Sequence, residues 1–174
     1  MSGSVNRGGR SAPSRPYVRA QLSLLDRLID EAPELSSDTL MSPGEHLAAL
    51  RRSVARDLEM LLNSRRRWRT WPAEMRELTE SPLGYGIPDC TAGSFNDKRA
   101  REILRVQIED TLRRFEPRFA RVSVALVEST NSLDATLRLH IDALLHADPA
   151  PEPISFDTVV DAATASVIVR SPDV

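Results

Sequence analysis

The sequence has little of several residue types that would mark particular protein classes. It contains one cysteine, Cys90, which cannot form an internal disulfide and cannot alone hold a structural zinc ion. No stretch approaches the ~18 consecutive apolar residues of a membrane span, and the amino-terminal segment lacks the apolar core of a secretory signal. We therefore expect a cytoplasmic protein without a structural metal.

Aromatic residues and net charge are also low. Aromatic side chains make up 5% of the 174 residues and the net charge is −2, which excludes a globally basic nucleic-acid-binding protein. The charge is unevenly distributed, because residues 122–174 carry two basic and eight acidic side chains. The hydrophobic content of 41% and the charged content of 28% are ordinary for one soluble domain. The C-terminal third is therefore expected to be acidic within an otherwise balanced chain.

The first half of the chain predicts a tail followed by helices. Residues 1–21 are rich in Ser, Gly, Pro and Arg and predict a disordered tail, whereas residues 22–172 predict one domain. Residues 23–30 place four apolar side chains on one face and predict a short helix that docks through them. Ser42, Pro43 and Glu45 form a capping-box pattern, which predicts a helix that continues to about residue 64.

The second half predicts one more helix and then strands. A capping signal at residues 94–97 begins a helix that Pro117 ends, and residues 65–94 are too irregular for either regular period. After Arg121 the apolar period changes to two, which predicts strands at 122–128, 135–143, 154–160 and 166–170. The predicted fold class is therefore α+β, with two main helices and a short N-terminal helix packed on a small antiparallel sheet.

The residues that carry common catalytic chemistry occur in no recognisable arrangement. The sequence lacks the phosphate-binding, zinc-protease and nucleophile-elbow motifs, and its three histidines favour solvated or packing roles over metal ligation. Glu116 stands two residues before Arg118, which favours an ion pair over the free general acid that a glycosidase needs. We therefore expect no catalytic residue, no cofactor and no metal site.

Residues 65–71, RRRWRTW, form the only internal segment that resembles a nucleic-acid-binding signature. The same segment also fits the basic end of the preceding helix, where cations complement the helix dipole and tryptophans pack on the core. We favour the structural interpretation, and an arginine-rich nucleic-acid adaptor stays as an alternative function.

Five segments occur in a characteristic order: SLLDRLID from residue 23, SVARDLEMLLNSRR from 53, SPLGYGIPD from 81, RRFEPRF from 113 followed by VSVAL, and ISFDTVVD from 154. Together they resemble the TssE family of type VI secretion baseplate subunits. This family is similar to the wedge protein of contractile phage tails that was once labelled lysozyme-like. The chain departs mildly from the family pattern, with Gly84 where an asparagine is more frequent and Ala55 where an arginine is.

The resemblance implies a structural role and not an enzymatic one. It implies a cytoplasmic baseplate docked on the inner-membrane complex, with the wedge subunits TssF and TssG, the TssB and TssC sheath, and the tube and spike as partners. It also implies candidate partner contacts at the Glu-Pro-Arg motif, Glu116, Pro117 and Arg118, and on the matched helix at Arg56 and Asn63. Whether the motif is an interface or an internal staple stays open, and a small cell-wall hydrolase stays as the enzymatic alternative.

The last strand is the candidate site for starting the sheath. An open sheet edge is a template for strand addition by another protein, because its backbone donors and acceptors are unpaired. Val167 and Val169 lie in the last predicted strand, where a main-chain ladder with a sheath subunit would form. Which amides of this strand face outward, and whether the strand is at the edge, cannot be read from periodicity alone.

Overall fold

The computed structural model describes residues 23–29, 33–34, 42–66, 71–72, 74–89, 97–127, 136–146, 150–161, 164 and 166–171. Its elements are α1 (Leu24–Leu28), α2 (Pro43–Asn63), α3 (Glu77–Glu80), the 3₁₀ turn η1 (Pro82–Gly84), α4 (Lys98–Phe115), β1 (Phe119–Val127), β2 (Thr136–Leu145), β3 (Glu152–Asp161) and β4 (Val167–Arg170). This arrangement confirms the predicted α+β class. The predictions for residues 1–21, Cys90 and most of RRRWRTW lie outside the described residues.

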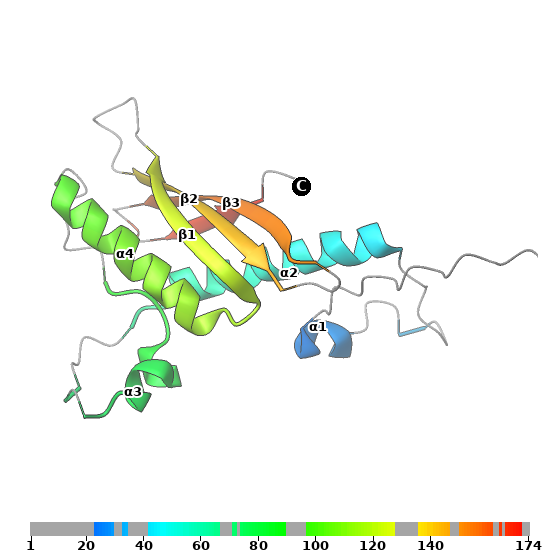
Figure 1. Ribbon diagram of the computed structural model, residues 1–174, viewed down its shortest axis with the longest axis horizontal. Coiled ribbons are helices and arrows are strands. Elements are labelled where there is room, and N and C mark those ends of the chain that lie inside the picture. The colour runs from blue at the N-terminus through cyan, green and yellow to red at the C-terminus, as the bar shows by residue number, and fades with distance from the viewer. Residues whose placement is uncertain are drawn as a thin grey trace, which may run out of the picture.

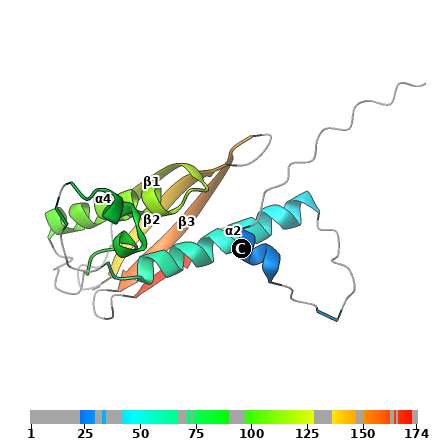
Figure 2. The same cartoon turned by 90° about the horizontal axis from the view of Figure 1, so that it is seen from below.

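The four strands form one antiparallel sheet in the order β1-β2-β3-β4, so that β1 and β4 are its edges. Along each strand, buried residues alternate with exposed or half-buried ones, as in Leu137, Leu139 and Ile141 of β2. α4 lies beside β1, and α2 passes on the side of β3 and β4 (Figure 1, Figure 2). The buried face of the sheet and the two long helices therefore enclose one core.

The apolar stripes of the two long helices contribute to that core as their spacing predicts. Ser42 caps α2 by accepting from the Glu45 amide, and the Glu45 carboxylate accepts from the Ser42 amide at 2.6 Å. The stripe residues that are buried in the two helices are Leu50, Val54, Leu58 and Leu61 of α2 and Leu104, Ile108 and Leu112 of α4. Leu47, in the first turns of α2, is only half-buried.

The irregular connector after α2 is tied back to that helix. The Ile87 amide donates to the Ser64 carbonyl at 3.0 Å, and the Arg66 amide donates to the Ile87 carbonyl at 2.8 Å. Gly86 permits this contact, because its φ is +96° and a Cβ at this position would lie 2.4 Å from the Ser64 carbonyl oxygen. The fully buried Ile87 side chain then anchors the connector in the core.

The prediction that α1 docks through its apolar face is wrong. Leu24 and Leu28 are 72% and 78% exposed, and none of the five residues of α1 is buried. The helix is instead held by polar groups: Ser23 caps it by accepting from the Asp26 amide, and Asp26 contacts α2. The apolar stripe of α1 is therefore displayed on the surface of the domain.

Candidate functional site

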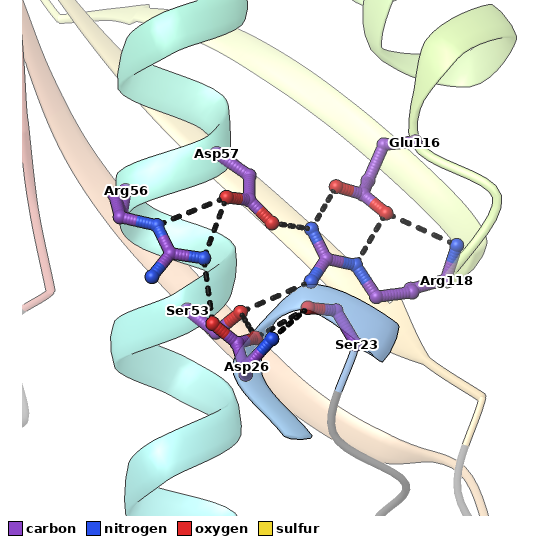
Figure 3. Close-up of polar contacts among 7 residues, drawn as sticks. All are labelled: Ser23, Asp26, Ser53, Arg56, Asp57, Glu116 and Arg118. Atoms are coloured by element: carbon purple, nitrogen blue, oxygen red, sulfur yellow. Dashed lines mark hydrogen bonds and ion pairs between the residues drawn. The ribbon is translucent and has the colours of Figure 1, made fainter. Parts of the chain in front are cut away.

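The Glu-Pro-Arg motif forms the turn between α4 and β1. Glu116 is the C-cap of α4, Pro117 cannot continue the helix because it has no amide hydrogen, and β1 begins at Phe119. The Phe119 amide donates to the Glu116 carbonyl at 3.2 Å, which closes a turn with proline at its second position. This turn directs the side chains of Glu116 and Arg118 toward α2 (Figure 3).

All three nitrogens of the Arg118 guanidinium donate hydrogen bonds within the chain. It binds both carboxylate oxygens of Glu116, with Nε donating to Oε1 at 2.6 Å and Nη2 donating to Oε2. Nη2 also donates to Asp57 of α2 at 2.8 Å, and Nη1 reaches the Ser53 hydroxyl at 3.4 Å. The Glu116 side chain is 6% exposed, so Arg118 neutralises a carboxylate that would otherwise be buried without a partner.

A second arginine extends this network to α1. Nη2 of Arg56 donates to Asp26 of α1 at 2.7 Å and also contacts Asp57 at 3.1 Å, and Ser53 donates to Asp26 as well (Figure 3). Burial acts to raise the pKa of Asp26, but the hydrogen bonds from Ser23, Ser53 and Arg56 outweigh it and lower the pKa to about 2. The network therefore links three segments that are far apart in the sequence: α1, α2 and the α4–β1 turn.

The outer edge of β4 is occupied by side chains of α2. The Asn63 side-chain amide imitates a neighbouring strand residue: its Oδ1 accepts from the Val167 amide at 2.9 Å and its Nδ2 donates to the Val167 carbonyl at 2.8 Å. One turn earlier, the Glu59 carboxylate accepts from the Val169 amide at 3.2 Å. The backbone groups of Val167 and the amide of Val169 thus face outward, away from β3.

The outer edge of β1 is closed in a similar way by α4. The Glu109 carboxylate accepts from the Val124 amide at 3.2 Å, and Nη1 of Arg105 donates to the Val124 carbonyl at 3.0 Å. Arg113 donates to the carbonyl of Val122 at 3.5 Å. In contrast to the β4 side, these three helical side chains also pair with one another, because Glu109 forms ion pairs with both arginines.

Matching periods of helix and strand explain why both edges are closed by the same device. Four helical residues rise ~6 Å, and two strand residues advance ~6.7 Å. Side chains at positions i and i+4, such as Glu59 and Asn63, can therefore reach successive outward backbone groups of a strand that runs alongside. Asn63 and Val167 are 104 positions apart in the sequence, so only the packed fold brings them together.

The structure divides the predicted partner-binding residues between two places joined by α2. Glu116, Arg118 and Arg56 belong to the polar network and Pro117 to its turn, whereas Val167 and Val169 form the β4 edge that Asn63 caps. The predicted ion pair between Glu116 and Arg118 is confirmed. Their binding to other proteins stays a prediction.

Sequence reasoning missed the partners of these residues. Asp26, Ser53 and Asp57 complete the Arg118 network, and Glu59 completes the cap of β4. A detectable signal was the pair Glu59 and Asn63, two polar residues four apart on a helix whose buried stripe runs beside them. Arg105, Glu109 and Arg113 have the same spacing with alternating charge.

The described part of the chain shows neither a metal site nor a membrane-spanning helix. It contains no group of three His, Cys, Asp or Glu side chains placed to hold a metal ion. None of its helices combines the length and the apolar content that a membrane span requires.

The structure is that of an α+β domain with a polar network at a helix–sheet junction and two edge strands that are capped by helical side chains. The family profile described as "Baseplate wedge protein gp25" matches residues 48–150, and the chain belongs to this family. No curated protein matches the chain. The protein is therefore a structural baseplate component of a phage-tail-like system, and its partners are other baseplate proteins.

Proposed function

We propose that this chain is a type VI secretion baseplate subunit that joins the wedge and starts sheath polymerisation by strand pairing at β4. The observation that carries the proposal is the cap of β4. This strand lies at the end of the sheet, and its outward Val167 amide, Val167 carbonyl and Val169 amide are bound by the side chains of Asn63 and Glu59 of α2. A partner strand offers the same donors and acceptors as Asn63 and Glu59, so it can replace them without leaving unpaired groups.

Proline variants test the sheath role. Proline at Val169 removes a donor that faces outward and leaves the ladder between β4 and β3 intact, because the Val169 amide binds Glu59. We expect Val169→Pro to allow baseplates to assemble, visible as fluorescent foci at the inner membrane, while no extended sheath grows from them.

The matched control is Val124→Pro, which removes an outward donor from the opposite edge of the sheet. This variant is expected to keep normal sheath growth, and thermal melting establishes that both variants are folded. Normal sheaths with Val169→Pro contradict strand pairing at β4. Loss of sheaths with Val124→Pro alone moves the template to β1.

The Arg118 network supports a second part of the proposal, the contact with the wedge subunits TssF and TssG. The network fixes α1 through Asp26 and Arg56, and it keeps Leu24 and Leu28 on the surface. Exposed apolar groups of this kind are typical of protein-binding surfaces. The Glu-Pro-Arg motif then acts on wedge assembly by positioning α1 and the turn.

Two variants separate wedge binding from stability. Leu24→Ser with Leu28→Ser is expected to leave the melting temperature unchanged, because both side chains are largely exposed, and to weaken co-purification with TssF and TssG. Arg118→Lys replaces a planar fork by a point charge and is expected to weaken that binding while the monomer stays folded. If Arg118→Lys melts far below the wild type and its folded fraction binds normally, the motif is an internal staple only.

The same observations favour a structural role over the hydrolase alternative. Glu116 is the acidic residue that the sequence places at the helix–sheet junction, and both of its carboxylate oxygens are bound by Arg118. A general acid in a glycosidase must instead hold a proton that it can donate to the leaving group. We propose a cytoplasmic location at the inner-membrane complex, which the fluorescent foci also report.

A further inference from the structure

The cap on the β4 edge stops before the strand does. Asn63 and Glu59 bind the outward groups of Val167 and Val169, and the next position in that helical row, four residues before Glu59, is Ala55. Alanine has no polar atom to offer a backbone group. By the alternation of an antiparallel ladder, the Val169 carbonyl also faces the outer edge. No hydrogen bond from another described residue to this carbonyl is present, so within the described part of the chain the edge is uncapped at its C-terminal end.

An open groove of about 320 Å³ lies at this position, lined by Arg52 and Ala55 of α2 and by Arg170 and Ser171 at the end of β4. The Ser171 hydroxyl oxygen is buried there without a hydrogen-bond partner. Neither Arg52 nor Arg170 forms an ion pair with another described residue. The groove therefore combines an unsatisfied hydroxyl at the end of an edge strand with two arginine residues, of which Arg170 lies opposite Asp157 of β3 without forming an ion pair with it.

The charge around the groove selects the kind of segment that fits it. Residues 122–174 contain only two basic residues, and one of them, Arg170, lines the groove. Guanidinium groups bind carboxylates through paired hydrogen bonds, and a basic segment would be repelled by both arginines. Successive side chains of an added strand point to opposite faces, so acidic residues at every second position would lie on the same side.

We infer that this groove receives an acidic, extended segment of a neighbouring protein in the assembly. The segment hydrogen bonds to the Val169 carbonyl and the Ser171 hydroxyl and places carboxylates on Arg52 and Arg170. The inference rests on the proposed role in assembly, because it concerns the same edge strand. To that proposed role it adds the place on β4 where the partner strand first binds and the acidic character of that strand.

The test is an NMR titration of the isotopically labelled full chain with two capped pentapeptides. The first is Thr-Glu-Val-Glu-Thr, and the second has lysine in place of both glutamates. We expect the acidic peptide to shift the amide signals of Ala55 and Ser171, and the lysine peptide to leave them unchanged. The double variant Arg52→Gln, Arg170→Gln should lower the affinity for the acidic peptide about tenfold or more, because both charge-assisted contacts are lost.

The matched control is Arg99→Gln with Arg114→Gln, which removes two exposed arginines from α4 and should leave the affinity unchanged. Three results overturn the inference: no shift at the groove with millimolar acidic peptide, equal binding of the lysine peptide, or equal affinity in the groove double variant. These failures leave sheath initiation untouched. Conversely, normal sheath growth with Val169→Pro and intact peptide binding removes sheath initiation and keeps the groove.

Discussion

The two edges of the sheet are closed by the same geometry and by different chemistry. At β1 the cap consists of Arg105, Glu109 and Arg113, which pair with one another as well as with the strand. At β4 the cap consists of Asn63 and Glu59, and neither forms an ion pair with another described residue. Exchanging hydrogen bonds that are not part of an ion pair for those of a partner strand costs less free energy than separating paired charges.

This difference favours β4 over β1 as the edge that would accept a strand in the proposed function. Natural sheets protect their edges against unwanted pairing with charged side chains and covering helices. Here both edges are protected, but only the β4 cap can be exchanged at low cost. The same strand also ends at the uncapped groove between Arg52 and Arg170.

The largest effect is expected from breaking the β1 cap. Glu109→Ala leaves two arginines without their shared partner and the Val124 amide without an acceptor, because Glu109 serves all three. We expect a loss of about 2 kcal/mol in the free energy of unfolding, measured by urea denaturation. Glu59→Ala at the other edge should lose about 1 kcal/mol or less. Equal losses in both variants would mean that the two caps do not differ.

A smaller effect is expected from Asn63. Asn63→Ala removes two hydrogen bonds to Val167, and the strand groups left behind can bind water at the edge. We expect a loss of about 1 kcal/mol. Asn63→Asp keeps the acceptor for the Val167 amide but faces its carbonyl with a second oxygen, so it should be no more stable than the alanine variant. A wild-type stability in Asn63→Asp would show that the bond to the Val167 carbonyl contributes nothing.

The smallest effect is expected in the middle of the sheet, at His140. The hydrogen bond to Asp157 on β3 raises the pKa of His140, and burial opposes this rise. The nearby Asp142 carboxylate raises the pKa further. Arg138 and Arg170 lie on the same exposed face of the sheet. A raised folded-state pKa gives stability that is fully present below the unfolded value of 6.5 and is lost as the pH rises through the folded value.

Thermal melting between pH 6 and pH 8 measures this slope. The melting temperature should fall slightly as the pH rises, and His140→Gln should flatten the fall. Variants of the caps leave His140 and its bond to Asp157 in place, so they should keep the slope. A slope that survives in His140→Gln would assign it to another group.

The fold was predictable where local rules act. The alternation of Leu137, Leu139 and Ile141 indicated a strand with one buried face, and the capping box at Ser42 and Glu45 indicated the start of α2. Pro117 correctly marked the end of the last helix, because proline excludes the preceding residue from helical geometry. In each case the signal lies within a few residues of the element that it predicts.

The site was predictable only in part, because its contacts join distant segments. The Glu116–Arg118 pair is local and was expected, whereas the bonds between Asn63 and Val167 depend on how α2 lies along β4. The apolar stripe of α1 led to the wrong docking face. Asp26, on the polar side of that helix, makes the contacts with α2, and no local pattern distinguishes an apolar stripe that is buried from one that is displayed.

Amide hydrogen exchange, measured by NMR on the purified full chain, tests the difference between the edges most directly. The outward amides of Val124, Val167 and Val169 are compared in one molecule, so that global stability is the same for all three. We expect the Val124 amide to exchange only through global unfolding, and the amides of Val167 and Val169 to exchange much faster through local release of Asn63 and Glu59. Protection of the two β4 amides equal to that of Val124 would contradict an exchangeable cap at β4.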